Sequence, residues 1–334
     1  MPPLVSVIVP CHNSRKTLAL CVEAALTQTY AEIEVIVVDD ASTDDSAAIA
    51  EGLGATVVRM PVNGGAGLAR NRGMAAARGD ILFFADSDVA LAPDAVEQAV
   101  RMFAEHPEYA AVWGVYGDRP LVDDGIVERV QVLTGHYRQS RLDVVHTGHF
   151  AVGALRREVV DRLGGFDERL VGQWTNEDHE FGLRIAENFP VGRAVHVVGF
   201  HDDDDRVTSV VRKRFGRAVS LIPLVLKQRD LKPEREALHR AAELAAIGLT
   251  GLGVLLAVVW PVLGVLAAVG LAAFLWTIRG MLGFVRTAAG LRVATAAAAL
   301  TFVYGFAVGL GGLTGALRYA VDPSFRRRYQ TVSM

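Results

Sequence analysis

Short apolar runs alternate with helix-like patterns through the N-terminal part of the chain. Four runs have the length of buried strands; they lie at residues 5–9, 33–38 and 55–58 and from residue 81 onward. Between the first two, Leu18, Val22 and Ala25 recur at helical spacing. This alternation implies parallel strands joined by right-handed crossovers. We therefore expect an α/β fold built on a mostly parallel, Rossmann-like sheet.

The hydrophobic pattern changes in the C-terminal part. Residues 244–278 and 293–317 are stretches of 35 and 25 residues without a charge. A membrane-spanning helix needs about 20 such residues, and a buried core helix rarely runs that long. We therefore expect a catalytic domain at 1–227, with a basic interfacial segment near 206–227, and a membrane domain at 228–334. Three hydrophobic helices are expected, at 244–260, 262–278 and 293–317.

Charge divides the chain in the same way. Seven of the 34 basic residues and two of the 37 acidic residues lie after residue 240, so that part has a net charge of +5. The other 27 basic and 35 acidic residues give the first part −8. Clusters of Lys and Arg interleaved with aromatics are missing, so nucleic acid is not an expected partner.

Arginine placement predicts an orientation for the membrane domain. Arginines stand before, between and after the two uncharged stretches, and such clusters favour the cytoplasmic side. Cys11 and Cys21 form no disulfide framework, and residues 4–9 are too short for a secretory signal. We expect a multi-pass protein of the cell (inner) membrane with its catalytic domain in the cytoplasm.

Two carboxylates follow the fourth apolar run directly. Asp86 and Asp88 flank Ser87 at the expected strand end. Open α/β sheets bind ligands at the carboxyl ends of their strands, and hard oxygen ligands there suit Mg²⁺ or Mn²⁺ holding a diphosphate. The alternative is an acidic turn that caps the helix beginning near Pro93.

A glycine-rich loop at residues 63–67 precedes a helix that carries Arg70. Its spacing matches neither the Walker nor the dinucleotide fingerprint. Two interpretations remain open. The loop is either a tight turn or a turn whose backbone N–H groups approach phosphate oxygens together with Arg70.

Six motifs in order resemble the family 2 glycosyltransferases of GT-A fold, across roughly residues 4–220. They are VSVIVP followed by Asn13, then VVDDAST, GGAGLARNRG, the DSD triplet, GGFDERL and NEDHEFGLRI. The uncharged C-terminal stretches lie outside this resemblance.

The resemblance implies a donor side for a nucleotide sugar, with UDP favoured. Asp40 would accept from uracil N3–H and Asp39 would support the loop, while His12 stands where the family often has a stacking aromatic. Asp86, Asp88 and His201 would hold Mn²⁺ or Mg²⁺ against the diphosphate. The alternative for His201 is a histidine at a strand end beside an acidic turn. The expected donor-binding residues are Pro10, His12, Asn13, Asp39, Asp40, Arg70, Asp86 and Ser87.

The resemblance also implies an acceptor side in the second half of the domain. Residues 147–153 are expected to form a strand leading toward the acceptor pocket, with His149, Trp174 and Glu177 on the acceptor side. Asp178 would be the general base. The alternative is that residues 176–180 are only the acidic first turn of a helix, favoured by its dipole.

These expectations describe a membrane-associated, inverting, metal-dependent hexosyltransferase. It would move a sugar from a nucleotide donor to a hydroxyl of a lipid or lipid-linked acceptor. A second interpretation is transfer to polyprenyl phosphate, whose ionised oxygen needs no base. A third is a catalytically silent membrane scaffold that binds a nucleotide sugar.

Overall fold

The computed structural model describes residues 2–141, 148–170, 176–227 and 235–330. The chain clusters into two compact units, which are described separately. The first consists of Met1–Val122 with Asp143–Asp203, and the second of Asp123–Leu142 with Asp204–Thr331. The second unit takes a helix from the middle of the chain in addition to its C-terminal residues.

The first unit is built on an eight-stranded sheet with the order β3-β2-β1-β4-β7-β6-β8-β5. The four strands on one side, β3, β2, β1 and β4, are parallel neighbours. On the other side β7 runs antiparallel to β4 and β6, β5 runs antiparallel to β8, and β6 and β8 are parallel. The strands are β1 Val5–Cys11, β2 Ile33–Asp39, β3 Thr56–Arg59, β4 Ile81–Ala85, β5 Val89–Leu91, β6 Ala111–Tyr116, β7 Val152–Arg156 and β8 Val191–His201.

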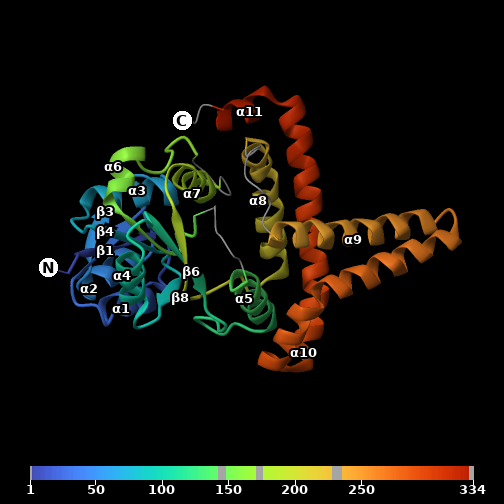
Figure 1. Cartoon of the computed structure of the whole chain (residues 1–334), viewed down its shortest axis with the longest axis horizontal. Helices are drawn as coiled ribbons and strands as arrows, with labels where there is room; N and C mark the ends of the chain where they lie inside the picture. The colour runs from blue at the N-terminus through green and yellow to red at the C-terminus, as the bar shows by residue number, and fades with distance from the viewer. Residues whose placement is uncertain (1, 142–147, 171–175, 228–234, 331–334) are drawn as a thin grey trace. The chain divides into compact units, whose positions relative to one another are not determined.

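Helices cover both faces of this sheet (Figure 1). Successive side chains of a strand point to opposite faces, so Val7 and Val9 of β1 join one core while Ile8 joins the other. The first core takes side chains from α1 (Leu18–Leu26), α2 (Ser46–Gly52) and α4 (Ala95–Glu105). The second takes them from α3 (Ala66–Ala76), α6 (Arg157–Leu163) and α7 (Glu177–Asn188).

The expected α/β fold is confirmed, with a mixed rather than a mostly parallel second half. The strand expected at 147–153 is β7, which in the described residues begins later, at Val152, and ends at Arg156. It pairs antiparallel with β4 on one edge and with β6 on the other.

The second unit is helical. Its helices are α5 Ile126–Gln139, α8 Val207–Lys227, α9 Arg235–Ala257, the short 3₁₀ helix Pro261–Leu263, α10 Gly264–Val321 and α11 Pro323–Gln330. Non-helical backbone at Gly290 (φ 83°, ψ 175°) interrupts α10. Within this unit, α9 and the first part of α10 form a hairpin (Figure 1). Their backbones approach so closely that a Cβ on Gly253 would lie 2.2 Å from the backbone nitrogen of Ala267.

Two segments of this unit, Leu238–Ala257 and Pro261–Val321, are long and apolar enough to cross a membrane by length and composition. The first expected hydrophobic helix, 244–260, ends earlier, at Ala257. The other two, 262–278 and 293–317, lie within the second segment, and Gly290 marks the break between them. Large apolar side chains are exposed around the end of the hairpin, among them Val258 at 82% and Val262 at 78%. Residues 279–289, between the last two expected helices, continue the helix α10.

Candidate functional site

The turn at residues 86–88 lies between β4 and β5 and is held in place by α1 and the residues before it. Thr17 donates through its hydroxyl to the backbone oxygen of Ser87 at 2.9 Å. The hydroxyls of Ser87 and Ser14 are 2.8 Å apart. Because these contacts fix the backbone, the two flanking carboxylates have a defined direction at the carboxyl end of β4.

Arg70 links this turn to the start of α7. Its guanidinium donates to Asp86 Oδ1 at 2.7 Å, and Nη1 lies 3.6 Å from a carboxylate oxygen of Glu177. The Arg70 residue is 4% exposed and packs over the ring of Phe166. Burial opposes its charge, but the carboxylates of Asp86 and Glu177 outweigh burial and raise the Arg70 pKa. One buried cation therefore connects the expected donor side with the expected acceptor side.

His201, at the end of β8, lies between two carboxylates. Its Nε2 is 3.4 Å from Asp88 Oδ2 and its Nδ1 is 3.6 Å from Asp203 Oδ2. The ring stacks on Tyr116 with centroids 4.6 Å apart. Burial would lower the His201 pKa, but the interactions with Asp203 and Asp88 raise it to about 10. The ring therefore carries a proton at neutral pH in the metal-free protein.

The residues Asp86, Asp88 and His201 fit a divalent cation in their chemistry. Carboxylate oxygens are the ligands that Mg²⁺ and Mn²⁺ prefer, and imidazole is a common additional ligand for transition metals. A cation here would have to displace the His201 proton, because only neutral imidazole ligates metal. Since Arg70 already compensates Asp86, Asp88 is the carboxylate that offers its charge to a cation.

His149 is a buried histidine near several of these charged side chains. Its Nδ1 is 3.1 Å from the backbone oxygen of Gly114, which can only accept, so Nδ1 carries the proton. Burial lowers the His149 pKa, and the charges of Asp86, Asp178 and His201 also act on it. The neutral ring therefore carries its proton on Nδ1, and Asp86, Asp178 and His201 lie close enough to it to influence its charge.

Asp178 belongs to the first turn of α7, after Asn176, whose backbone is left-handed (φ 54°, ψ 40°). The backbone N–H of His179 donates to Asp178 Oδ1 at 2.8 Å. The Asp178 side chain is 31% exposed, so its carboxylate remains accessible. Trp174, expected on the acceptor side, lies outside the described residues.

Asp40 is buried and bonded to the glycine-rich loop. The backbone N–H groups of Gly64 and Gly65 donate to its two carboxylate oxygens at 2.7 and 2.8 Å. Gly65 has φ +83°, a conformation that favours glycine. These two backbone N–H groups are therefore already bonded and do not point to a phosphate. Arg70, which was expected to bind phosphate together with the loop, is bonded to Asp86 instead. The structure favours the alternative, a tight turn.

The expected nucleotide side is ordered by a small network. His12 Nδ1 donates to the backbone oxygen of Asp40 at 2.8 Å, and the side-chain amide of Asn13 lies 3.0 Å from His12 Nε2. Asn13 Oδ1 accepts from the backbone of Thr43. Asp39 Oδ1 accepts from the backbone of Ser42 at 3.2 Å, which gives it the loop-supporting position expected for it. Pro10 lies inside β1, opposite Val38 of β2.

Two residues of this site were not predicted from the sequence. Tyr116 contacts both histidines, since its ring also meets His149 edge-on at 4.7 Å. Asp203 belongs to the acidic run 202–205, which carried no assigned role. The sequence could have indicated a carboxylate near the His201 ring only through the position of Asp203 two residues later.

Comparison with known proteins shows a family similarity in the N-terminal part of the chain. The family described as Glycosyl transferase family 2 matches residues 6–164. The glycosyltransferase GlyG of Streptococcus pneumoniae is 35% identical over 121 residues, which cover 35% of this chain and 40% of GlyG. Chondroitin synthase of Pasteurella multocida is 34% identical over 201 residues, which cover 58% of this chain and 20% of the synthase. The chain thus spans less than half the length of these curated relatives.

A solved structure has a similar fold. The mannosyltransferase PcManGT from Pyrobaculum calidifontis, in complex with GDP-Man and Mn²⁺, superposes with a TM-score of 0.59 at 21% identity. The match covers 97% of this chain and 88% of that one. Residues 6–164 therefore match the family 2 glycosyltransferases, and the fold is GT-A-like.

Proposed function

We propose that this glycosyltransferase domain moves a sugar from a nucleotide donor, with UDP favoured, to a hydroxyl of a lipid or lipid-linked acceptor at a membrane. The observation that carries the proposal is the position of Arg70, which contacts both Asp86 and Glu177. Through it, the carboxylates assigned to the donor diphosphate lie beside the acidic pair assigned to the acceptor.

In this proposal Asp178 is the general base. The acceptor hydroxyl attacks the anomeric carbon from the side opposite the leaving nucleotide, so the configuration at that carbon is inverted. Asp178 takes the hydroxyl proton, and its partly exposed position leaves it room to do so. A hydroxyl acceptor is favoured over polyprenyl phosphate, because an ionised phosphate oxygen needs no base.

Asp86, Asp88 and His201 would hold Mn²⁺ or Mg²⁺, which when bound neutralises the charge of the leaving diphosphate. Arg70 keeps Asp86 in position for this role. His12 and Asn13 would contact the nucleotide, with Asp40 reading the base through lone pairs left beside its two backbone contacts.

The membrane part of the proposal rests on the exposed apolar side chains of α9 and α10 and on their two long apolar segments. Contiguous exposed apolar surface of this kind marks a partner or a membrane. A membrane explains in addition why residues 244–278 and 293–317 carry no charge.

The test uses the full-length protein in detergent with Mn²⁺ and a panel of UDP- and GDP-sugars. GDP-sugars are included because PcManGT was solved with GDP-Man. Lipid extracts provide the acceptor, and both nucleotide release and a hexose-sized mass shift of a lipid are measured. The matched control is Asp178→Asn. Nucleotide binding without transfer from any donor would favour the scaffold interpretation and contradict the proposal.

A further inference from the structure

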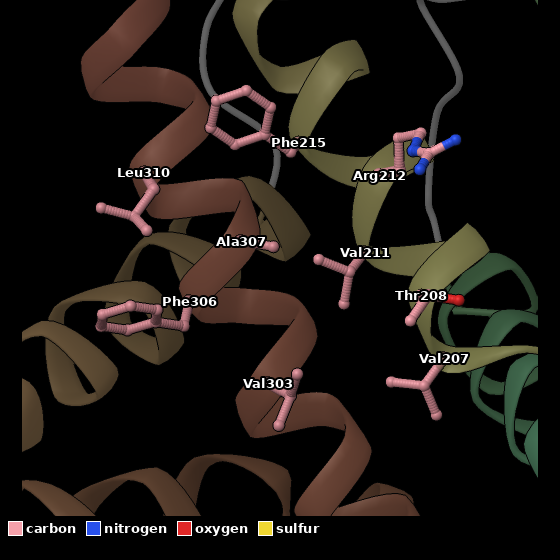
Figure 2. Close-up of a pocket in the computed structure, with 9 residues that line it drawn as sticks. All are labelled: Val207, Thr208, Val211, Arg212, Phe215, Val303, Phe306, Ala307 and Leu310. Atoms are coloured by element: carbon pink, nitrogen blue, oxygen red, sulfur yellow. The ribbon is translucent and has the colours of Figure 1, made fainter.

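An apolar groove of about 480 Å³ runs between α8 and the second part of α10 (Figure 2). This volume lies in the range of small-molecule sites. Its lining is aliphatic and aromatic except for Thr208 and Arg212. The lining residues are Val207, Thr208, Val211, Arg212 and Phe215 of α8, and Val303, Phe306, Ala307 and Leu310 of α10.

The walls of the groove are open to the surroundings. On α10, Val303, Phe306 and Leu310 are each more than 40% exposed. They belong to the stretch 293–317, which carries no charge. If this stretch lies in a bilayer, as proposed above, the groove faces hydrocarbon rather than water.

The groove closes beyond Leu310, where the two helices come into backbone contact. A Cβ on Gly311 would lie 2.5 Å from the backbone oxygen of Phe215, and one on Gly315 would lie 2.4 Å from that of Val219. An α-helix with its side chains is about 10 Å wide and has no room at such a contact. A groove that narrows in this way fits a single hydrocarbon chain better than a helix.

Arg212 is the polar feature of this groove. Its side chain is exposed and its guanidinium extends away from α10 (Figure 2). Neighbouring cations have partners, since Lys213 pairs with Asp204 and Arg214 donates to Gln131. Arg212 makes no hydrogen bond or ion pair within the part of the chain that the structure describes. An uncommitted guanidinium beside an apolar groove matches a phosphate attached to a hydrocarbon chain.

We propose that the groove between α8 and α10 holds one hydrocarbon chain of the lipid-linked acceptor, with Arg212 binding the phosphate that joins the chain to its head group. This inference rests on the proposed function, because it states where the lipid part of the proposed acceptor binds. It defines the acceptor class as a phosphate-linked lipid, whose sugar or other hydroxyl-bearing head receives the transferred unit.

The experiment uses full-length protein in detergent micelles and hexadecyl phosphate with a photoreactive diazirine on its chain. Mass spectrometry of the irradiated protein maps the labelled residues. We expect labelling at Val211, Val303, Phe306 and Leu310, in excess over Leu255 and Val262 at the hairpin, which are more exposed. Even labelling of all exposed apolar residues would mean general coating by lipid and would overturn the proposal.

Two pairs of variants separate the chain from the phosphate. Val303→Trp should block labelling of the groove, whereas Leu313→Trp, at an exposed position outside it, should not. Arg212→Gln should weaken binding of hexadecyl phosphate about tenfold, as expected for one charge-assisted hydrogen bond, and Arg212→Lys should weaken it less. A second probe is the alcohol with the same diazirine-bearing hexadecyl chain and no phosphate. Neither Arg212 variant should change labelling by this alcohol. Equal effects on phosphate and alcohol would overturn the role of Arg212.

The labelling requires neither donor nor turnover, so the two proposals fail separately. Groove labelling without sugar transfer to any lipid would contradict the proposed function alone. Transfer to a lipid-linked acceptor that is unchanged by Val303→Trp would contradict the groove alone. Cross-links between two copies of the chain at α10 would show that a second copy fills this surface and would also overturn the inference.

Discussion

The guanidinium of Arg70 donates to Asp86 at 2.7 Å while its other terminal nitrogen lies 3.6 Å from Glu177. A residue of the turn after β4 and a residue of α7, far apart in the sequence, thereby share one buried positive charge. Removal of that charge would leave two carboxylates close together without compensation, so Arg70 positions both.

Replacement of Arg70 by methionine tests this relationship. We expect the free energy of unfolding to fall by about 3 kcal/mol, the lower end for a broken buried ion pair, because Asp86 remains partly exposed. Chemical denaturation measures the loss. The matched control is Arg59→Met, which breaks an exposed pair with Glu51 and should lower the free energy of unfolding much less. Equal losses in the two variants would contradict the buried role.

Asp178→Asn tests the general base. Removal of such a base typically costs about 10²–10⁴ in rate, so turnover should fall at least about a hundredfold while donor affinity stays the same. Glu177→Gln should lose less, because that side chain contacts Arg70 and points elsewhere on α7. Turnover and donor binding are measured separately. Near-normal turnover of Asp178→Asn would restore the phosphate-acceptor interpretation.

Asp88→Asn tests the cation site. Asp88 contacts His201, and its carboxylate is the one that Arg70 does not compensate. We expect Mn²⁺ binding and sugar transfer to be lost while the thermal unfolding of the metal-free protein stays close to that of the original chain. Asp205→Asn, in the acidic run that contains Asp203, is the control and should bind Mn²⁺ normally. Transfer that survives both Asp88→Asn and chelation would exclude the metal mechanism.

The affinity for Mn²⁺ should depend on pH through His201. The pKa of this ring is raised to about 10, so a proton competes with the metal at neutral pH. Because the proton must leave, apparent affinity should rise with pH, by up to about tenfold per unit below that pKa. Titrations between pH 6.5 and 8.5 would measure the slope. His201→Gln should flatten it, and a flat profile in the original chain would remove His201 from the ligand set.

Tryptophan fluorescence tests the membrane assignment. Trp260 and Trp276 are 62% and 67% exposed on the hairpin, whereas Trp113 is buried in the sheet. In vesicles of brominated lipid we expect strong quenching that Trp260→Phe reduces. Quenching that is unchanged in a double replacement of Trp260 and Trp276 by phenylalanine would argue against insertion of the hairpin.

The sequence predicts the first half of the sheet well, because its strands are continuous apolar runs bounded by polar residues. Ile81 and the residues after it illustrate this, and the carboxylates that follow are found at the strand end, as expected. The direction of β7 could not be predicted, because an antiparallel strand depends on its neighbours β4 and β6 rather than on its own pattern. The same holds for Tyr116, whose role comes from contacts with two histidines distant in sequence.

The arginines of segment 279–292 illustrate a different limit. Their charges separate the two uncharged stretches, yet the helix α10 continues through this segment to Gly290, where the backbone breaks. Helix propensity and the packing of Phe274, Ile278 and Met281 into the second unit outweigh the local charge pattern. Charge indicates which medium a face meets, whereas helix ends depend on backbone conformation at residues such as glycine.

The contact of Asp40 with Gly64 and Gly65 has a consequence for the energetics of donor recognition. A glycine-rich loop has high conformational entropy, and ordering it at the moment of binding would weaken affinity. Here the buried carboxylate orders both glycines when the chain folds. Nucleotide association should therefore resemble docking to a rigid surface, with little ordering of this loop, and its entropic cost should fall mainly on the donor itself.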